Sequence, residues 1–226
     1  MMAADYQALA RELAADHLDP PGALQVKGFA SGSWVVPVAN CQDGFWSAFT
    51  AANNAESAPM DRWVRSCLSR IAERHGCNLL MPTDGPPFHP FQSWALALGN
   101  CWQSPIGLLI HRHAGLWWAL RGALVFESPL QAAPPIRQAG PSPCLSCTAQ
   151  PCLHRCPVAA FDGTGFAVDR CRQHLQTDRQ ETCIDAGCLA RAACPYVTST
   201  SYPLAQRRFH MRHFRDSAAI DNPDRR

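Results

Sequence analysis

Hydrophobic residues recur along the chain at two different spacings, which predict a mixture of helices and strands. Apolar positions three and four residues apart predict a helix over residues 3–17 and a longer one over residues 59–75. A further short helix is expected from Trp94 to Leu98. Runs rich in β-branched and aromatic residues predict strands, which cover residues 24–29, 34–38, 78–81, 106–110 and 120–126. The pattern predicts an α+β fold for residues 1–128.

A proline-rich segment separates this first unit from the rest of the chain. Residues 129–143 contain five prolines among small and polar neighbours, a composition typical of an extended linker. We therefore expect a second, smaller domain over residues 144–200 and a tail over residues 201–226. In the tail, basic residues alternate with apolar ones, which predicts a basic amphipathic helix. A solvated helix is the commoner form of such a stretch, and docking on an acidic redox partner is the alternative.

Eight of the 12 cysteines lie after the linker, in two runs that each end in Cys-Pro. The first run is Cys144, Cys147, Cys152 and Cys156. It reproduces the bacterial ferredoxin spacing, except that two extra residues separate its second and third members. The second run is Cys171, Cys183, Cys188 and Cys194. Eight ligands of this kind predict two iron–sulfur clusters of the [4Fe–4S] type, and hence electron transfer.

In two-cluster ferredoxins the fourth cysteine of a run ligates the other cluster, because it lies too far round the loop to reach its own. This crossover rule assigns Cys144, Cys147, Cys152 and Cys194, here called the first set, to one cluster. It assigns Cys156, Cys171, Cys183 and Cys188, here called the second set, to the other. The alternative is tetrahedral zinc, which also takes four thiolates but explains neither the Cys-Pro steps nor the chained ligands. The remaining cysteines lack such spacing and are expected to be core residues; they are Cys41, Cys67, Cys77 and Cys101.

Composition narrows the class of protein further. The 226 residues carry a net charge of +2 from 20 basic and 18 acidic side chains, so nucleic acid is an unlikely partner. The sequence has no apolar run of about 18 residues and no basic start followed by an apolar stretch, so neither a membrane span nor a signal peptide is expected. A cytoplasmic location follows. Because thiols stay reduced there, twelve cysteines indicate metal rather than disulfides.

One segment resembles a known family. From Ile110 to Gly122 the chain is similar to a stretch of the cobalamin-trafficking protein that decyanates and dealkylates cobalamin. The matching positions are Ile110, His111, Gly115, Trp117, Ala119, Arg121 and Gly122. The order of features also looks like epoxyqueuosine reductase, with the helix over residues 59–75, Asp84-Gly85-Pro86, Leu98-Gly99 and the cysteine region. The resemblance implies a nitroreductase-like domain that binds cobalamin, followed by a two-cluster ferredoxin-like domain.

The resemblance also implies roles for individual residues. His111, Gly115, Trp117 and Arg121 are expected to contact the corrinoid. Asp84 is expected to be a proton donor near the cobalt, since an apolar pocket would raise the pKa of its carboxyl group. For each residue there is a plainer interpretation: a satisfied histidine, a core tryptophan, a salt-bridged arginine and a turn-forming aspartate.

Together these observations predict a redox protein that passes electrons from two clusters to a bound corrinoid, either reducing cobalamin or removing its upper ligand. A ferredoxin or flavodoxin is the expected electron donor. One alternative is a ferredoxin-type carrier that binds no corrinoid. Another is an epoxyqueuosine-reductase-like tRNA enzyme, against which the near-neutral charge and the small size argue.

Overall fold

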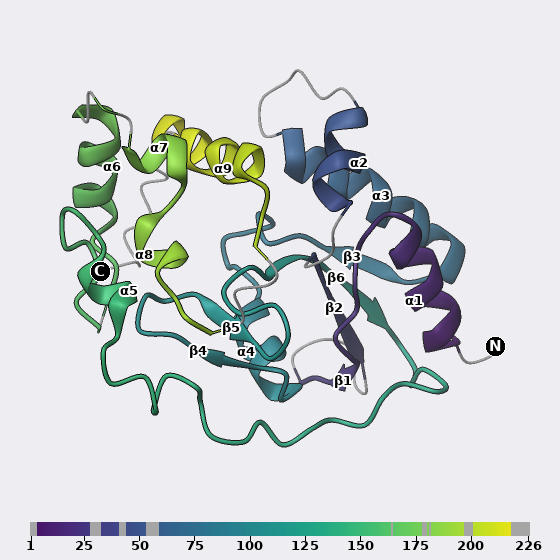
Figure 1. Ribbon diagram of the computed structural model, residues 1–226. Helices are drawn as coiled ribbons and strands as arrows, with labels where there is room; N and C mark the ends of the chain where they lie inside the picture. Colours follow the sequence, from purple (N-terminus) through teal and green to yellow (C-terminus); the bar gives the residue numbers. More distant parts are fainter. Residues whose placement is uncertain are drawn as a thin grey trace.

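The computed structural model describes residues 4–27, 33–40, 44–52, 59–163, 165–177, 180, 182–196 and 201–217. The predicted α+β architecture is confirmed (Figure 1). Residues 4–128, here the N-terminal unit, contain every helix and strand up to β6. Its helices are α1 (Tyr6–Ala15), α2 (Phe45–Ala51), α3 (Pro59–His75) and α4 (Phe91–Ala97). Its strands are β1 (Leu24–Gln25), β2 (Trp34–Asn40), β3 (Asn78–Leu80), β4 (Cys101–Gln103), β5 (Leu109–His111) and β6 (Ala119–Phe126).

An antiparallel sheet in the order β1-β2-β6-β3 forms the middle of the N-terminal unit. Because side chains alternate along a strand, each of its two faces buries a different set. Val36 and Leu124 pack with α1, α2 and α3 on one face. Val35 and Val125 pack with α4 on the other. The sheet is therefore a layer between helices.

Gly122 allows α3 to lie close against the central strand β6. An ideal Cβ at this position would lie 2.5 Å from Leu68 Cδ1 and 3.2 Å from Leu80 O. The glycine of the family-like segment thus has a packing role that any larger residue would disturb.

The strand prediction was wrong around residue 106. Residues 104–108 form a turn, and β5 pairs with β4 in a separate two-stranded sheet, with Cys101 opposite His111. Strand β4 was not predicted. Each strand of this hairpin has three residues, which is too short for an alternating pattern to be recognised.

The proline-rich segment is extended but fastened to the N-terminal unit. It contains no helix or named strand and runs along the lower edge of the molecule in Figure 1, from the end of β6 to α5. The Tyr6 N–H donates to Gln131 O at 3.0 Å, and Trp102 Nε1 donates to Gly140 O at 2.8 Å. Leu130 is buried in the main core. These contacts hold both ends of the segment in place.

The described part of residues 144–196, here the cysteine unit, is built from short helices. They are α5 (Pro151–His154), α6 (Val168–Thr177), α7 (Thr182–Ala186) and α8 (Leu189–Ala192). An isolated bridge joins Phe161 to Phe166. The described residues of the tail form helix α9 (Leu204–Asp216). In Figure 1 this yellow helix lies between the cysteine unit and helices α2 and α3.

Helix α9 is amphipathic, as predicted, but its apolar face is not solvated. Phe209 contacts Trp46 and Phe49, with ring centroids 5.4 and 5.3 Å apart. Met211 and Phe214 pack on the core of the cysteine unit. The interpretation as a solvated tail is therefore wrong for this face, because its aromatic and aliphatic side chains find apolar partners in both units.

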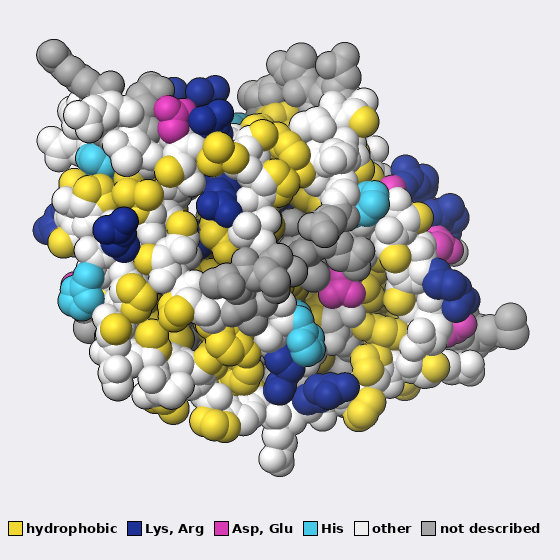
Figure 2. Space-filling model, in the orientation of Figure 1, with side chains coloured by type: hydrophobic (Ala, Val, Ile, Leu, Met, Phe, Trp, Pro, Cys, Tyr) yellow, Lys and Arg dark blue, Asp and Glu magenta, His cyan; other side chains and the backbone are white. Residues whose placement is uncertain are grey.

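The surface matches the near-neutral composition. On the face shown in Figure 2, Lys and Arg side chains are dispersed rather than gathered into one patch. Two arginines of α3 form ion pairs with α1 and its C-cap: Arg74 pairs with Glu12 of α1 at 2.9 Å, and Arg70 pairs with the C-cap residue Asp16 at 2.7 Å. Within the described residues, no helix has the length and hydrophobicity needed to cross a bilayer.

Candidate metal centre

Four cysteines from distant parts of the cysteine unit line one cavity of about 330 Å³. They are Cys144, Cys147, Cys152 and Cys194. The first two belong to a turn in which the Cys147 N–H donates to Cys144 O at 3.3 Å. Cys152 lies in α5, and Cys194 follows α8. These are the four cysteines that the crossover rule assigns to one cluster.

The N-terminal unit supplies one wall of this cavity. Ile110 of β5 and Leu116 line it together with Pro105, and Cys152 packs in the same apolar cluster as Ile106. Burial raises the pKa of the Cys152 thiol, and the neighbouring thiols of its set raise it further. The cavity is thus a place where several thiols meet in apolar surroundings.

The other four cysteines also approach one another. Cys156 follows α5, Cys171 lies in α6, Cys183 in α7 and Cys188 directly before α8. Burial raises the pKa of Cys171 to about 12, and the proximity of Cys188, Cys156 and Cys183 contributes to the shift. The fold therefore gathers the second predicted set as well, beside the apolar residues Leu175 and Ile184.

Backbone amides point at several of these sulfurs. The Ala160 N–H donates to Cys156 Sγ at 3.3 Å. The backbone N–H groups of Arg191 and Tyr196 act to lower the pKa of Cys188 and Cys194, respectively, but burial outweighs them and raises both pKa values. Donors of this kind stabilise negative charge on sulfur, whether in a thiolate or in a metal-bound state.

The donor type suits an iron–sulfur cluster, since each set consists of four cysteines. The cavity of the first set is also lined by the polar side chains of Ser104, Ser146 and Gln150. In the part of the chain that the structure describes, no group of three or more His, Cys, Asp or Glu side chains is arranged to hold a metal ion. Cys67 and Cys101 are buried in the cores of the N-terminal unit, as expected, and Cys77 packs at the edge of one. Cys41 lies outside the described residues.

His111 and Gly115 form a closed turn rather than an open binding surface. Their backbones bond reciprocally, at 2.7 and 2.9 Å. His111 Nδ1 accepts from the Ala114 N–H at 3.3 Å, and the imidazole stacks on Trp118 with ring centroids 5.0 Å apart. Burial lowers the pKa of His111 to about 4, so the ring is neutral at pH 7. These contacts give the histidine a packing and turn-closing role.

Trp117 and Arg121 lie where the two units meet. The Trp117 indole is covered by the guanidinium groups of Arg191 and Arg207, at 4.5 and 4.4 Å from the ring. Arg121 donates from Nε to Asn40 Oδ1 and lies over the Phe45 ring. It also lines a cavity of about 270 Å³ beside α9. Trp117 is therefore not an open platform in this arrangement, and Arg121 is a half-buried cation.

Asp84 lies in surroundings opposite to those expected. Its carboxylate pairs with Arg65 at 2.5 Å and accepts from the Met81 N–H at 2.9 Å, and its side chain is 35% exposed. Partial burial acts to raise the pKa of Asp84, but the bonds from Arg65 and Met81 outweigh it and hold the pKa below its usual value. The expectation of an apolar pocket with a raised pKa is wrong.

Sequence reasoning missed Arg191 and Tyr202. Tyr202 is buried with its ring against Trp117, at a centroid distance of 5.4 Å. Arg191 Nε and Nη2 donate to Leu116 O at 2.9 and 2.6 Å. A single arginine or tyrosine repeats at no spacing, so periodicity carries no signal for either.

Comparisons with known proteins show a distant likeness to a solved structure. No protein-family model matches the sequence, and a search of curated proteins finds no match. The crystal structure of a B12-trafficking protein, CblC, from C. elegans is similar to 95% of this chain and 98% of that one, with a TM-score of 0.46 and 13% sequence identity. A likeness of this size assigns neither a ligand nor an activity to the chain.

Proposed function

We propose that this chain is an electron-transfer protein that holds two [4Fe–4S] clusters in its cysteine unit. The observation that carries the proposal is the cavity lined by Cys144, Cys147, Cys152 and Cys194. Cys194 comes after the whole second set in the sequence, yet it joins the first three cysteines of the run. Interleaving of this kind is typical of two-cluster ferredoxins.

The protein's own residues would hold the two clusters close together and shield them partly from solvent. Cys152 and Cys156 are separated by one helical turn at the end of α5 but belong to different sets, so this helix joins the two sites. Ile110 and Leu116 shield the first site from water, and Leu175 and Ile184 shield the second. A bound cluster of this type supplies reversible one-electron chemistry.

The first cysteine set lies nearer to the N-terminal unit, which suggests the direction of transfer. Its cavity wall includes Ile110 and Leu116, the residues that flank the His111–Gly115 turn. We therefore propose that electrons enter at the second set and leave from the first, toward the N-terminal unit. A ferredoxin or flavodoxin is the proposed donor.

Potentiometric titration of the anaerobically purified protein, followed by electron paramagnetic resonance, tests the electron-transfer function. We expect two reversible one-electron transitions and a reduced spectrum broadened by interaction between two neighbouring paramagnets. Two independent, unbroadened signals would contradict the interleaved arrangement. A protein with no reducible centre would overturn the proposed function.

A corrinoid is the electron acceptor that we propose, on the strength of the segment from Ile110 to Gly122. Because Arg191 and Arg207 cover Trp117, a flat macrocycle would reach the indole only if α8 and α9 moved. Added cobalamin should shift to its base-off spectrum and stay with the protein through gel filtration. Trp117→Leu should weaken this retention, and Trp63→Leu, in the aromatic cluster under α2, should not. Full reduction of the clusters without any corrinoid retention would favour the plain electron carrier.

A further inference from the structure

Ser104 lines two neighbouring cavities where the N-terminal unit meets the cysteine unit. One is the cavity of about 330 Å³ that the first set lines, and the other is a larger cavity of about 720 Å³. The residues that border both are Ser104, Pro105, Cys144 and Gln150. Ser104 of the N-terminal unit and Cys144 of the first set therefore lie on the boundary between the same two cavities.

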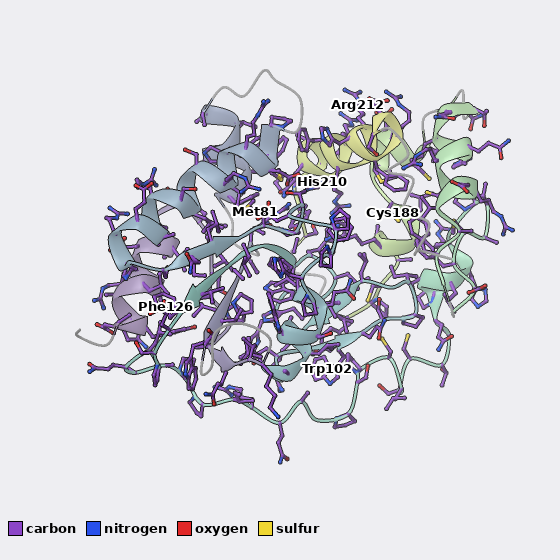
Figure 3. All side chains as sticks on the ribbon, turned by 180° about the vertical axis from the view of Figure 1, so that it is seen from behind. Met81, Trp102, Phe126, Cys188, His210 and Arg212 are labelled. Atoms are coloured by element: carbon purple, nitrogen blue, oxygen red, sulfur yellow. The ribbon has the colours of Figure 1, made fainter. Side chains whose placement is uncertain are left out.

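The backbone of Ser104 is fixed by the turn that joins β4 to β5. Its N–H donates to Leu108 O at 2.9 Å, and its carbonyl oxygen accepts from the Gly107 N–H at 3.0 Å. Trp102, two residues earlier, packs on the apolar residues that line the cavity of the first set. Figure 3 shows this tryptophan next to the proline-rich segment, to which its indole N–H donates. The turn thus holds Ser104 in a set position against the cysteine unit.

The hydroxyl of Ser104 takes no part in this turn. Only 7% of the residue is exposed, and among the described residues its Oγ has no hydrogen-bond partner. By contrast, the hydroxyl of Ser146, which lines the same cavity, donates to Pro143 O at 3.2 Å. A buried hydroxyl without a partner is costly, because folding removes the water that would bond to it. The Ser104 O–H is therefore available to a sulfur bound in the cavity.

A hydrogen bond to a cluster sulfur changes the reduction potential of the cluster. Reduction adds a negative charge, part of which lies on the sulfurs, so a donor stabilises the reduced state more than the oxidised state. The effect is stronger where water is excluded. Ile110 and Leu116 provide such apolar surroundings in this cavity.

We propose that the Ser104 hydroxyl donates a hydrogen bond to a sulfur of the cluster held by the first set, on the side of Cys144, and raises the reduction potential of that cluster. The inference rests on the proposed function, since it requires that the first set holds a cluster. It makes the first site the easier one to reduce, which agrees with electron transfer from the second set to the first. In this way the N-terminal unit tunes the cluster that lies nearer to it.

Ser104→Ala removes the hydroxyl and keeps the rest of the side chain. We expect the first cluster to become harder to reduce, by a factor of about ten in its reduced-to-oxidised ratio at a fixed potential, or about 59 mV for one electron. The potential of the second cluster should stay the same. Ser104→Thr, which keeps a hydroxyl, should change the ratio by less than about threefold. The readout is a potentiometric titration of each loaded variant monitored by electron paramagnetic resonance.

A second background assigns the shift to one cluster. Cys183→Ser is expected to keep the first cluster alone, so adding Ser104→Ala to it should produce the same shift in the remaining signal. A remaining signal with an unshifted potential would overturn the inference.

Ser66→Ala is the matched control, because it removes the same atom from an exposed position of α3 that lines neither cavity. Its potentials should equal those of the unmodified protein. An unchanged first potential in loaded Ser104→Ala would overturn the inference and leave the two-cluster function intact. So would a shift in Ser104→Thr or Ser66→Ala as large as that in Ser104→Ala.

Loss of loading is also informative. If neither Ser104 variant bound iron and Ser66→Ala bound it normally, Ser104 would be a structural residue and the tuning role would be wrong. If the unmodified protein contained no cluster, the proposed function itself would fail.

Discussion

Individual thiols in both cysteine sets lie in surroundings that disfavour the thiolate. Burial raises the pKa of Cys152, and it raises the pKa of Cys171 to about 12. Metal binding requires the thiolate, so loading either site must release protons. A metal is therefore the means by which these buried sulfurs would become charged at neutral pH.

Cys194→Ser tests the crossed ligand assignment at the level of one atom. Because Cys194 lines the cavity of the first set, the variant should lose about half of its iron and keep the signal of the second cluster. The control variant Cys77→Ser, which changes a half-buried thiol outside both sets, should keep all of its iron. Iron analysis and electron paramagnetic resonance give the answer. If the variant lost the signal of the second cluster instead, Cys194 would be a ligand of that cluster and the crossed assignment would be wrong.

Cys183→Ser tests the second set, where the spacing is looser. The variant should keep the first cluster and lose the second, because Cys183 lies beside Cys171. Retention of both clusters would require a different fourth ligand for that site.

The Arg65–Asp84 pair predicts a pH-dependent contribution to stability. The pKa of Asp84 is lowered on folding, so its stabilisation is present above about pH 4, the unfolded value, and is lost as pH falls through the folded value. Both side chains are substantially exposed, so solvent screening limits the contribution to about 1 kcal/mol or less. Asp84→Asn should lower Tm slightly at pH 7 and show a smaller difference at pH 3. An equal difference at both pH values would contradict the ion-pair explanation.

At the scale of elements, α9 joins the two units through its apolar face. Phe209 reaches the aromatic residues of α2, and Phe214 reaches the cysteine unit. A helix bound on two sides in this way couples the stability of the N-terminal unit to that of the cysteine unit. It also explains why the tail is basic outside and aromatic inside.

Phe209→Ala should therefore destabilise the loaded protein. The ring is half-buried, so we expect a cost of about 2 kcal/mol, below that of a fully buried phenylalanine. Arg212→Ala, on the exposed side of the same helix, should change stability by less than about 0.5 kcal/mol. Thermal unfolding followed by circular dichroism measures both. Equal Tm values for the two variants would show that α9 is not anchored through Phe209.

The contact between Gly99 and the proline-rich segment gives another prediction. Gly99 has φ +72°, and a Cβ there would lie 1.8 Å from Arg137 O, so Gly99→Ala should release the segment. Gly140→Ala meets nothing within 4 Å and is the matched control. Trypsin should cut after Arg137 much faster in the first variant than in the second. Equal cleavage rates would mean that the segment is not held at Gly99.

For the whole molecule, long patterns were predictable and short ones were not. The apolar stripe of α3 and the continuous apolar runs of β2 and β6 extend over enough residues to be recognised. The hairpin of β4 and β5 is too short for that. The docking of α9 depends on partners such as Trp46 that are remote in sequence, so an amphipathic pattern alone could not distinguish docking from solvation.

The candidate site also has a part that the sequence predicts and a part that it does not. Cysteine spacing predicts which thiols share a site, and the four cysteines of the first set line one cavity. That either set binds a cluster stays a prediction. The surroundings of His111, Trp117 and Asp84 depend on side chains such as Trp118, Arg207 and Arg65, which no local motif specifies. Their roles toward a corrinoid remain predictions.

The central claim is that the cysteine unit holds two iron–sulfur clusters, and elemental analysis tests it most directly. Protein purified without oxygen should contain about eight iron atoms and about eight acid-labile sulfides per chain, with zinc well below one. One or two zinc ions per chain without labile sulfide would contradict the claim and make the cysteine unit a structural zinc domain.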